Sequence, residues 1–534
     1  MKKRIFAALA AGMLASAALV SCGNSGASSS ASSEDKASSA AESSGSSEES
    51  PAENSADPAA EAIVNRTETE HLVVSYFTWV GATEGISRIQ DKMNELTIPA
   101  LNIDVELNVT DFASRSQALT LAFSGGEQID IMYSLGLGLS NAVQNDYLMD
   151  LEMDDGNGNQ LIETYGKDII DTMGWDNLNT SRIGGVLYGT STQHDLAQGR
   201  NSILARRQTL EKAEAFMDLT PEYDTNIWKV DSQDDIVTII KALHDAEPSV
   251  TAYQPSASAS INWTSIDQLG GNVFGVLTDY GQNTEVVNYF ETEEYLNFVK
   301  MMYDLNQYGC ISPDAVTDTT SDQAAFQAGT INSFFTSGKP DIVPANDEDL
   351  ICIQGGPDFT GSTQIGGFCW TIGYTTVDPV AAMQYLNFMY QSPEWNNLFM
   401  WGEEGVDYTL NDEGLVVKDD NSDFSHAMQW LSPAEFKAYV QEGNPADLWQ
   451  QYEAFNDGAI VSKASGFTFD TAPVATQFTA VTNVYNQYQK AIEFGFSDPE
   501  SSIAEMNAAM KAAGIDDIVA EKQAQLDAWL ALQN

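Results

Sequence analysis

Basic side chains are scarce in this chain, and their scarcity limits the partners that it can bind. The 534 residues include 24 lysines and arginines against 77 aspartates and glutamates, which gives a formal net charge of −53. Binding to nucleic acid depends on clustered lysine and arginine that neutralise phosphates, so this balance argues against a nucleic-acid partner. It also argues against electrostatic binding to an anionic lipid surface, and we interpret the acidity as a solvated surface that keeps the protein soluble.

Cysteine and histidine are also rare, with four residues of each. No C-x-x-C or H-E-x-x-H spacing occurs, so we expect neither a zinc site nor a cofactor. Residues Asp155–Asn159 superficially resemble a calcium loop, but they lack its sixth-position glycine and twelfth-position glutamate, and we expect a surface turn. Apart from Cys22, the cysteines are Cys310, Cys352 and Cys369, which cannot all pair with one another. Whether Cys352 and Cys369 form a disulfide stays open.

Long apolar runs are absent, since none reaches the roughly 18 residues of a membrane-spanning helix. The apolar run Ile5–Val20 follows a lysine- and arginine-rich start and precedes small residues, which is the pattern of a secretory signal peptide. We therefore expect residues 1–21 to be removed. The tetrapeptide Leu19–Cys22 resembles the lipobox of bacterial lipoproteins, and this resemblance implies that Cys22 becomes the lipidated first residue of the mature protein.

Large apolar side chains are almost missing from the next segment as well. Residues 23–62 consist almost only of Ser, Ala, Gly, Glu, Asp and Pro, which cannot bury enough apolar surface to offset their conformational entropy. We expect residues 22–63 to form a disordered, lipidated tether that holds the protein outside a membrane. The chain that follows exceeds the roughly 250–300 residues at which a single core stops growing, so two lobes are expected.

Hydrophobic residues make up 43% of the chain and aromatics 10%, and their spacing predicts the secondary structure of the folded part. The first elements alternate between strand and helix, and they are expected at residues 72–77, 86–96, 103–109, 114–123 and 129–133. The order β-α-β-α-β predicts an α/β fold with a mostly parallel, doubly wound sheet, whose ligand-facing loops follow the strand C-termini. We place the first crossover between the lobes near Gln193–Arg200.

Helices dominate the later part of the sequence. The helical spacings are expected around residues 231–243, 295–308, 321–329, 379–390, 395–401, 471–494, 499–513 and 515–532. Strands are expected at 330–335 and 367–374, and a hairpin at 409–417, around an Asn/Asp/Gly turn.

Several segments resemble those of a known family, the extracellular solute-binding proteins of bacterial ABC importers. The resemblance is to the sugar-binding, family 1 branch, similar to maltose-binding protein, and to a lipoprotein subgroup with its own C-terminal region. The matching segments are Gly125–Ile131, Ala324–Thr330, Leu386–Glu394, Trp401–Tyr408, Lys511–Asp516 and Glu521–Trp529.

The resemblance implies a class II fold of two lobes, each a doubly wound sheet with flanking helices, plus extra C-terminal helices. We assign residues 64–195 and about 351–395 to the N-terminal lobe, and 196–350 and about 396–534 to the C-terminal lobe. Such a protein is expected to be a monomer, anchored through lipid on Cys22 to the outer face of a cell membrane. The resemblance to the subgroup implies a Gram-positive bacterium. It would capture a saccharide between its closing lobes and deliver it to the permease subunits of an ABC transporter.

A sugar site needs flat aromatic side chains for the ring faces and polar side chains for the hydroxyl groups. By the resemblance, three aromatic residues fall where the family lines its cleft, and they are Trp79, Trp263 and Phe335. Two more, Trp401 and Tyr408, flank a Gly-Glu-Glu-Gly loop. The polar candidates are Asp111, Ser134, Gln193 and Glu403, with Glu404 equally available by sequence and Asn262 weaker.

Each candidate also has an ordinary structural interpretation. A tryptophan more often fills a core than faces a ligand, and Asp111 and Glu403 are equally suited to cap a helix or to lie on the surface. The ligand stays open too, since the same fold would serve for a peptide, a polyamine or a uronide; a neutral saccharide is favoured because basic residues are so few. An anchored glycan-degrading enzyme would need a pair of carboxylates across one bond, and an adhesin would need no closing cleft.

Overall fold

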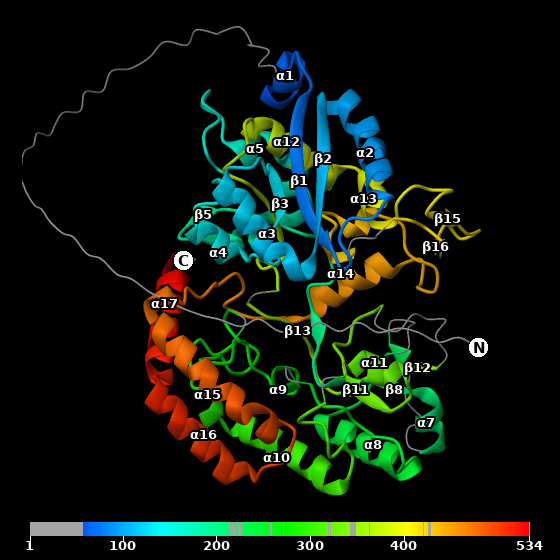
Figure 1. Ribbon diagram of the computed structural model, residues 1–534, viewed down its shortest axis with the longest axis vertical. Helices are drawn as coiled ribbons and strands as arrows, with labels where there is room; N and C mark the ends of the chain where they lie inside the picture. Colours follow the sequence, from blue (N-terminus) through cyan, green and yellow to red (C-terminus); the bar gives the residue numbers. More distant parts are fainter. Residues whose placement is uncertain are drawn as a thin grey trace, which may run out of the picture. The chain divides into compact units, whose positions relative to one another are not determined.

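Two five-stranded sheets organise the computed structural model, each with its own set of helices (Figure 1). The structure describes residues 57–213, 221–222, 227–256, 259–270, 272–318, 320, 322–341, 349–362, 364–419, 421–424 and 429–532. The expected signal peptide, Cys22 and most of the expected tether therefore lie outside the described residues. No helix in the described ranges is both long enough and apolar enough to cross a membrane.

The first sheet has the strand order β2-β1-β3-β14-β6. Its strands are β1 (Glu70–Thr78), β2 (Ile103–Asp111), β3 (Ile131–Tyr133), β6 (Thr190–Ser191) and β14 (Cys369–Ile372). Strand β1 pairs in parallel with β2 and β3, whereas β14 runs antiparallel to β3 and β6. The β-α-β-α-β order predicted from the sequence is confirmed, with α2 (Ile86–Leu101) and α3 (Phe112–Gly125) as the connections.

Helix α2 shows how the sequence produces these connections. Its buried positions Ile86, Ile89 and Met93 recur every three or four residues, so one face packs on the sheet. The helix does not end at Pro99 as the sequence predicts, but continues to Leu101. Pro99 has no amide hydrogen to donate within the helix, and the left-handed residue Asn102, with φ 54°, ends the helix two residues after Ala100.

The second sheet has the strand order β11-β8-β12-β10-β9 and mixes parallel and antiparallel pairs. Its strands are β8 (Ser202–Arg206), β9 (Pro221–Glu222), β10 (Ile227–Lys229), β11 (Ser333–Phe335) and β12 (Leu350–Gln354). The predicted helices around it are present as α8 (Gln233–Ala246), α10 (Glu293–Tyr308) and α11 (Asp322–Gln327). Short elements complete this half, namely α7 (Arg207–Lys212), α9 (Ala259–Asn262) and the 3-10 turn η1 (Tyr289–Glu291).

A third, small sheet forms where the chain passes between the two halves. It consists of β7 (Gln198–Gly199), β13 (Asp358–Thr360) and β17 (Ile460–Val461), with β13 in the middle. Each strand belongs to a different passage of the chain, and β7 lies inside the predicted crossover Gln193–Arg200. We call this element the crossover sheet.

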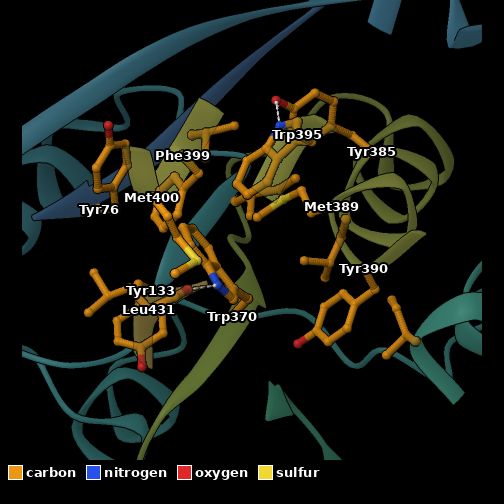
Figure 2. Packing of buried hydrophobic residues seen from close by; sticks show 14 of the residues in the cluster. Tyr76, Tyr133, Trp370, Tyr385, Met389, Tyr390, Trp395, Phe399, Met400 and Leu431 are labelled. Atoms are coloured by element: carbon orange, nitrogen blue, oxygen red, sulfur yellow. Dashed lines mark hydrogen bonds between the residues drawn. The ribbon is translucent and has the colours of Figure 1, made fainter. Parts of the chain in front are cut away.

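The described residues form two large hydrophobic cores, one around each five-stranded sheet. The first core joins helices α2, α6 (Lys167–Asn179), α12 (Pro379–Gln391) and α13 (Pro393–Trp401) to the first sheet. In Figure 2, Trp370 of β14 lies among side chains of α12 and α13, and its indole nitrogen donates to the Leu431 carbonyl at 2.9 Å. Trp395 donates in the same way to the Tyr385 hydroxyl at 2.9 Å.

The packing differs from the expected lobe boundary at residue 396. Side chains from Phe399 to Phe455, including those of α14 (Leu448–Gly458), pack in the first core, and the second core resumes only at Ala464. The reason is that α13 packs on α2, so the chain stays beside the first sheet until β17 takes it across. The first half holds several shorter elements as well, and they are α1 (Pro58–Asn65), α4 (Leu139–Gln144), α5 (Leu161–Tyr165), β4 (Arg182–Ile183), β5 (Val186–Leu187), β15 (Tyr408–Leu410), β16 (Val416–Lys418), η2 (Gln429–Leu431) and η3 (Glu435–Lys437).

The C-terminal helices pack in the second core. They are α15 (Ala475–Glu493), α16 (Pro499–Ala513) and α17 (Ile515–Leu532), preceded by the turn η4 (Ala472–Val474), and their bounds agree with the sequence prediction. Asp498 caps the start of α16 by accepting from the Ser501 amide, and Gly514, with φ 102°, ends it in the left-handed conformation. Figure 1 shows these helices side by side.

Candidate functional site

An exposed tryptophan marks the edge of the first sheet where its parallel strands end. Trp79 follows β1 directly and is 61% exposed, although a tryptophan usually buries most of its surface. Its ring lies edge-on to Phe112, with 5.2 Å between centroids, and to Phe77 at 6.1 Å. The neighbouring contacts hold the ring in place while leaving much of it in solvent, which suits a platform for an apolar ring face.

Further aromatic side chains continue from Trp79 along the same edge. Trp430 lies 6.2 Å from Phe77 and 5.3 Å from Phe368, centroid to centroid. Phe112 begins α3, Phe368 precedes the antiparallel strand β14, and both are half-buried. We call Trp79, Phe112, Phe368 and Trp430 the aromatic edge.

Sequence reasoning found Trp79 alone of these four. Phe112 carried a usable signal, because it directly follows the end of a predicted parallel strand. Phe368 directly precedes an antiparallel strand, which brings it to the same edge, but the strand direction was not readable from the sequence. Trp430 comes from a distant part of the chain, and no local pattern places it there.

Asp111 and Ser134 lie at this edge as expected, but both side chains are engaged within the protein. Asp111 caps α3 by accepting from the Ser114 amide at 3.0 Å, and hydrogen bonds from Ser114 lower the pKa of its carboxyl group. The buried Ser134 hydroxyl donates to the Gly367 carbonyl at 3.3 Å and accepts from the Cys369 amide at 3.2 Å. In this conformation Ser134 therefore joins β3 to the approach of β14.

Gln193 lies at the first crossover, where it helps to line a cavity of about 650 Å³. All three chain passages contribute to this cavity, through Gln193, Thr360 and Val461 among others. The Gln193 side-chain oxygen is buried and has no hydrogen-bond partner within the described ranges. Its neighbour His194 is buried, and burial lowers the pKa of its imidazole, so the ring is neutral at pH 7.

A cluster of charged side chains lies beside the first crossover. The Lys339 ammonium is 2.8 Å from Asp195 and 3.3 Å from Asp341. Glu435 of η3 is buried nearby, and burial, followed by the charge of Asp195, raises the pKa of its carboxyl group well above its usual value. The ammonium joins the segment after β11 to the crossover, which links the two halves of the chain.

Phe335 ends β11 and is half-buried, three residues before Gly338, which bridges to Gly199 of the crossover sheet. It is thus three residues from a bridge to the crossover sheet, and its role as a site residue stays a prediction. Within the described ranges, the Phe335 ring does not contact any ring of the aromatic edge.

Three other predicted site residues are buried in the cores instead of facing solvent. Trp263 is 2% exposed and its indole nitrogen donates to the Tyr253 hydroxyl at 3.1 Å. Trp401 is 1% exposed and donates to the Tyr439 carbonyl at 3.0 Å, and Tyr408 is buried in the same core. A buried ring cannot offer its face to a ligand, so the structure does not bring these residues to a site in this conformation.

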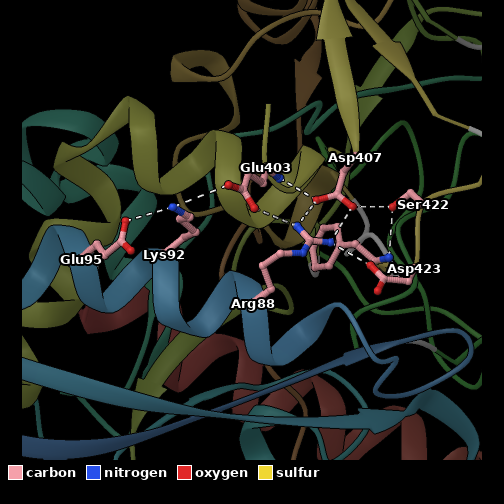
Figure 3. A network of polar contacts seen from close by, with 8 residues as sticks. Arg88, Lys92, Glu95, Glu403, Asp407, Ser422 and Asp423 are labelled. Atoms are coloured by element: carbon pink, nitrogen blue, oxygen red, sulfur yellow. Dashed lines mark hydrogen bonds and ion pairs between the residues drawn. The ribbon is translucent and has the colours of Figure 1, made fainter. Parts of the chain in front are cut away.

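Glu403 likewise has a different role from the expected one. Its carboxylate lies 3.3 Å from Arg88 and 3.6 Å from Lys92, both on α2 (Figure 3). The pairing ties the turn after α13 to α2. Within the described ranges, no contact of Glu403 with the aromatic edge is recorded. The backbone of Glu404 bridges to Tyr408, which distinguishes the two glutamates without placing either at a site.

The cysteines and the acidic loop have no described part in a site. Cys310, Cys352 and Cys369 are all free and buried, which settles the question left open by the sequence. The Asp155–Asn159 segment forms a turn closed by the bridge between Asp154 and Gln160, as expected. Among the described residues, no group of three or more His, Cys, Asp or Glu side chains is arranged to hold a metal ion.

Comparison with known proteins shows which proteins this chain resembles. Residues 463–531 match the family model described as a domain of unknown function (DUF3502). The chain is 23% identical over 420 residues to a carbohydrate ABC transporter substrate-binding protein of Streptococcus pneumoniae, an alignment that covers 76% of this chain and 82% of that protein.

Solved structures agree with the sequence relative. The N-glycan transport solute binding protein (NgtS) of S. pneumoniae superposes with a TM-score of 0.73 at 18% identity, covering 87% of this chain and all of that one. NgtS has also been solved in complex with Man5GlcNAc, with a TM-score of 0.63. An extracellular solute-binding protein of Bifidobacterium longum subsp. infantis gives 0.60 at 14% identity, covering 86% of this chain and 98% of that one. This chain therefore has the two-lobed α/β fold of the extracellular solute-binding proteins.

Proposed function

We propose that this protein captures a carbohydrate, of oligosaccharide size, between its two lobes and delivers it to the permease of an ABC importer. The observation that carries the proposal is the exposed Trp79 at the carboxyl edge of the first sheet, with Phe112, Phe368 and Trp430 beside it. Sugar rings stack their apolar faces on such side chains. The named relative handles carbohydrate, and NgtS has been solved with an oligosaccharide, which supports the same ligand class here.

The crossover sheet supplies the joint that this function needs. Its strands are two or three residues long, and each large core is built from its own sheet and helices. Bending at the joint would bring the second lobe, which carries Phe335, toward the aromatic edge of the first lobe. Closure of this kind excludes water from a ligand and forms a new outer surface for a permease to recognise. We assign residues 57–197 and 361–459 to the first lobe and the remaining described residues to the second.

The location of the protein follows from its expected N-terminus. We propose that Cys22 is lipidated and that the segment after it tethers the lobes to the outer face of the cell membrane. A binding protein that cannot diffuse away would present its ligand to the permease at a high local concentration. No catalytic step is part of the proposal.

A thermal-shift screen tests the ligand class. The mature chain, carrying Cys22→Ser so that it stays unlipidated, is heated with neutral oligosaccharides, uronides, peptides and polyamines. A ligand at 100 times its Kd adds about 2.7 kcal/mol to the free energy of unfolding, which raises the melting temperature measurably. We expect the shift with a neutral oligosaccharide. A shift only with peptides or polyamines would overturn the carbohydrate assignment, and release of new reducing ends from a bound glycan would show an enzyme.

A further inference from the structure

The crossover sheet separates two cavities, because side chains alternate between the faces of a strand. Thr360 of β13 pairs with Val461 of β17, and both line the cavity of about 650 Å³. The next residue back, Phe359, pairs with Gln198 of β7, and both line a second cavity of about 200 Å³. We call this second space the crossover cavity.

Uncommitted amide groups surround the crossover cavity. Gln198, Gln268 and Gln364 line it and are half-buried, and within the described ranges none of their side chains makes a hydrogen bond. Each amide offers two donors and one acceptor oxygen. Half-buried amides without protein partners are expected to bind water or a polar ligand, because an unmet polar group in a protected place costs free energy.

The two charged side chains of the cavity balance each other and are already engaged. The buried Arg200 guanidinium lies over the Phe359 ring at 4.7 Å, and it donates to the Ile261 carbonyl at 3.0 Å and to the Asn262 side-chain oxygen at 3.1 Å. Buried Asp267 accepts from the Ser362 amide and, at 2.7 Å, from the Ser362 hydroxyl. With one charge of each sign the cavity carries no net charge, and the buried Arg200 Nε has no hydrogen-bond partner within the described ranges, so it is a further donor for a polar ligand.

We infer that the crossover cavity is a subsite for one neutral, multiply hydroxylated ring, that is, a single sugar unit of the captured oligosaccharide. The inference rests on the proposed function and adds a location and a chemical preference to it. Three amides that both donate and accept match hydroxyl groups, which do the same, and the paired charges of Arg200 and Asp267 leave no net charge to favour an ionised ring. The volume holds one ring and not a chain of them.

The position of the subsite connects ligand binding to the joint. With the lobes assigned as above, Gln364 belongs to the first lobe, whereas Gln198, Gln268 and Asn262 belong to the second. A ring that hydrogen-bonds to Gln364 and to the second-lobe residues would hold the two lobes in a fixed relative orientation. Ligand binding at the subsite would thereby stabilise one arrangement of the two lobes relative to the others.

Three substitutions test the subsite. Gln198→Leu, Gln268→Leu and Gln364→Leu each remove the amide while keeping a side chain of similar size, in the mature chain with Cys22→Ser. Binding is measured by calorimetry with Man5GlcNAc, with kestose, and with further neutral oligosaccharides if those two do not bind. We expect each variant to bind three- to tenfold more weakly than the parent, the effect of one lost hydrogen bond.

The matched control is Gln208→Leu, an exposed glutamine on α7, which should leave the affinity unchanged. Melting temperatures without ligand show whether each variant is folded, and because the three glutamines lie on separate segments, the loss of one variant leaves two. Normal affinity in the folded variants overturns the subsite while the proposed function stands. A parent protein that binds no neutral saccharide at all overturns the proposed function, and the subsite with it. Tighter binding of a uronide than of its neutral counterpart overturns the preference for an uncharged ring.

Discussion

Arg88 of α2 donates two hydrogen bonds to Asp407, at 2.7 and 2.9 Å, and the Asp407 side chain has no exposed surface (Figure 3). Asp407 also accepts from the Glu403 amide at 2.7 Å and the Ser422 hydroxyl at 2.6 Å. Burial alone would raise the pKa of Asp407, but the hydrogen bonds from Arg88 and Ser422 outweigh it and lower the pKa. The guanidinium of Arg88 therefore holds the turn after α13 against helix α2.

Arg88→Met should destabilise the protein strongly, because it leaves the buried carboxylate of Asp407 without its cation. We expect a loss of about 3 kcal/mol, typical of breaking a buried ion pair from one side. Urea unfolding at pH 7 measures it. Lys92→Met is the comparison, since Lys92 is more exposed and its contacts are surface ion pairs, for which a loss of under about 1 kcal/mol is expected. Equal losses in the two variants would contradict this account.

Trp79→Ala and Trp263→Ala should separate a ligand platform from a core residue. Trp79 is mostly exposed, so its removal should weaken saccharide binding by roughly 1–3 kcal/mol and leave the unfolding midpoint almost unchanged. Trp263 fills the second core and should cost about 3–5 kcal/mol of stability. Calorimetric titration and urea unfolding of both variants measure the two effects. A Trp79→Ala protein that keeps full affinity would show that the aromatic edge is not the sugar platform.

Glu493 should make the stability of the second lobe depend on pH. It is fully buried at the end of α15, where Tyr485 donates to its carboxyl oxygen at 2.9 Å and Gln489 at 3.2 Å. Burial raises the pKa of Glu493 to about 7, from 4.5 in the unfolded chain. Between these pH values the folded state holds a proton that the unfolded state has released, so the stability is complete below about pH 4.5 and falls as the pH rises to 7.

The size of this effect follows from the shift, which corresponds to roughly 3 kcal/mol. Glu493→Gln cannot ionise and should remove this part of the pH dependence. Urea unfolding of parent and variant from pH 4.5 to 7.5 isolates it, because all other groups contribute equally to both proteins. If the difference in unfolding free energy between the two proteins stays constant over that range, Glu493 is ionised in the folded state.

Cys22→Ser should release the protein from the cell. Without the thiol no lipid can be attached, and the segment that follows is too polar to hold a membrane by itself. Fractionation of a producing bacterium measures the change, with the parent in the membrane fraction and the variant in the medium. A variant that still sediments with membranes would mean that something other than Cys22 anchors the chain.

The fold was predictable to the extent that local spacing determines it. The alternation of strands and helices from β1 to β3 and the bounds of α15, α16 and α17 followed from apolar periodicity and capping residues. The sequence did not predict to which lobe residues 396–459 belong, because the apolar spacing of an amphipathic helix does not show which sheet the helix packs against. Only the packing of α13 on α2 decides it.

The candidate site was less predictable, because exposure depends on contacts between distant residues. Trp79 and Trp263 both lie in irregular segments, yet one is exposed and the other donates a hydrogen bond inside a core. Glu403 looked available in a glycine-rich loop, but its partner Arg88 is 315 residues away in sequence. Trp430 and Phe368 meet only after β14 has entered the first sheet between β3 and β6.

The crossover sheet also restricts how the molecule can move. Two lobes joined by a single strand can rotate relative to each other in any direction. Three strands hydrogen-bonded side by side form a small sheet that bends readily about only one axis. Each approach of the two halves then repeats the same path, and a ligand meets the same pair of surfaces every time. Redundancy is a second consequence, since a chain cut between β7 and β8 would still be held together by two passages and by the same pairing of β13 with its neighbours.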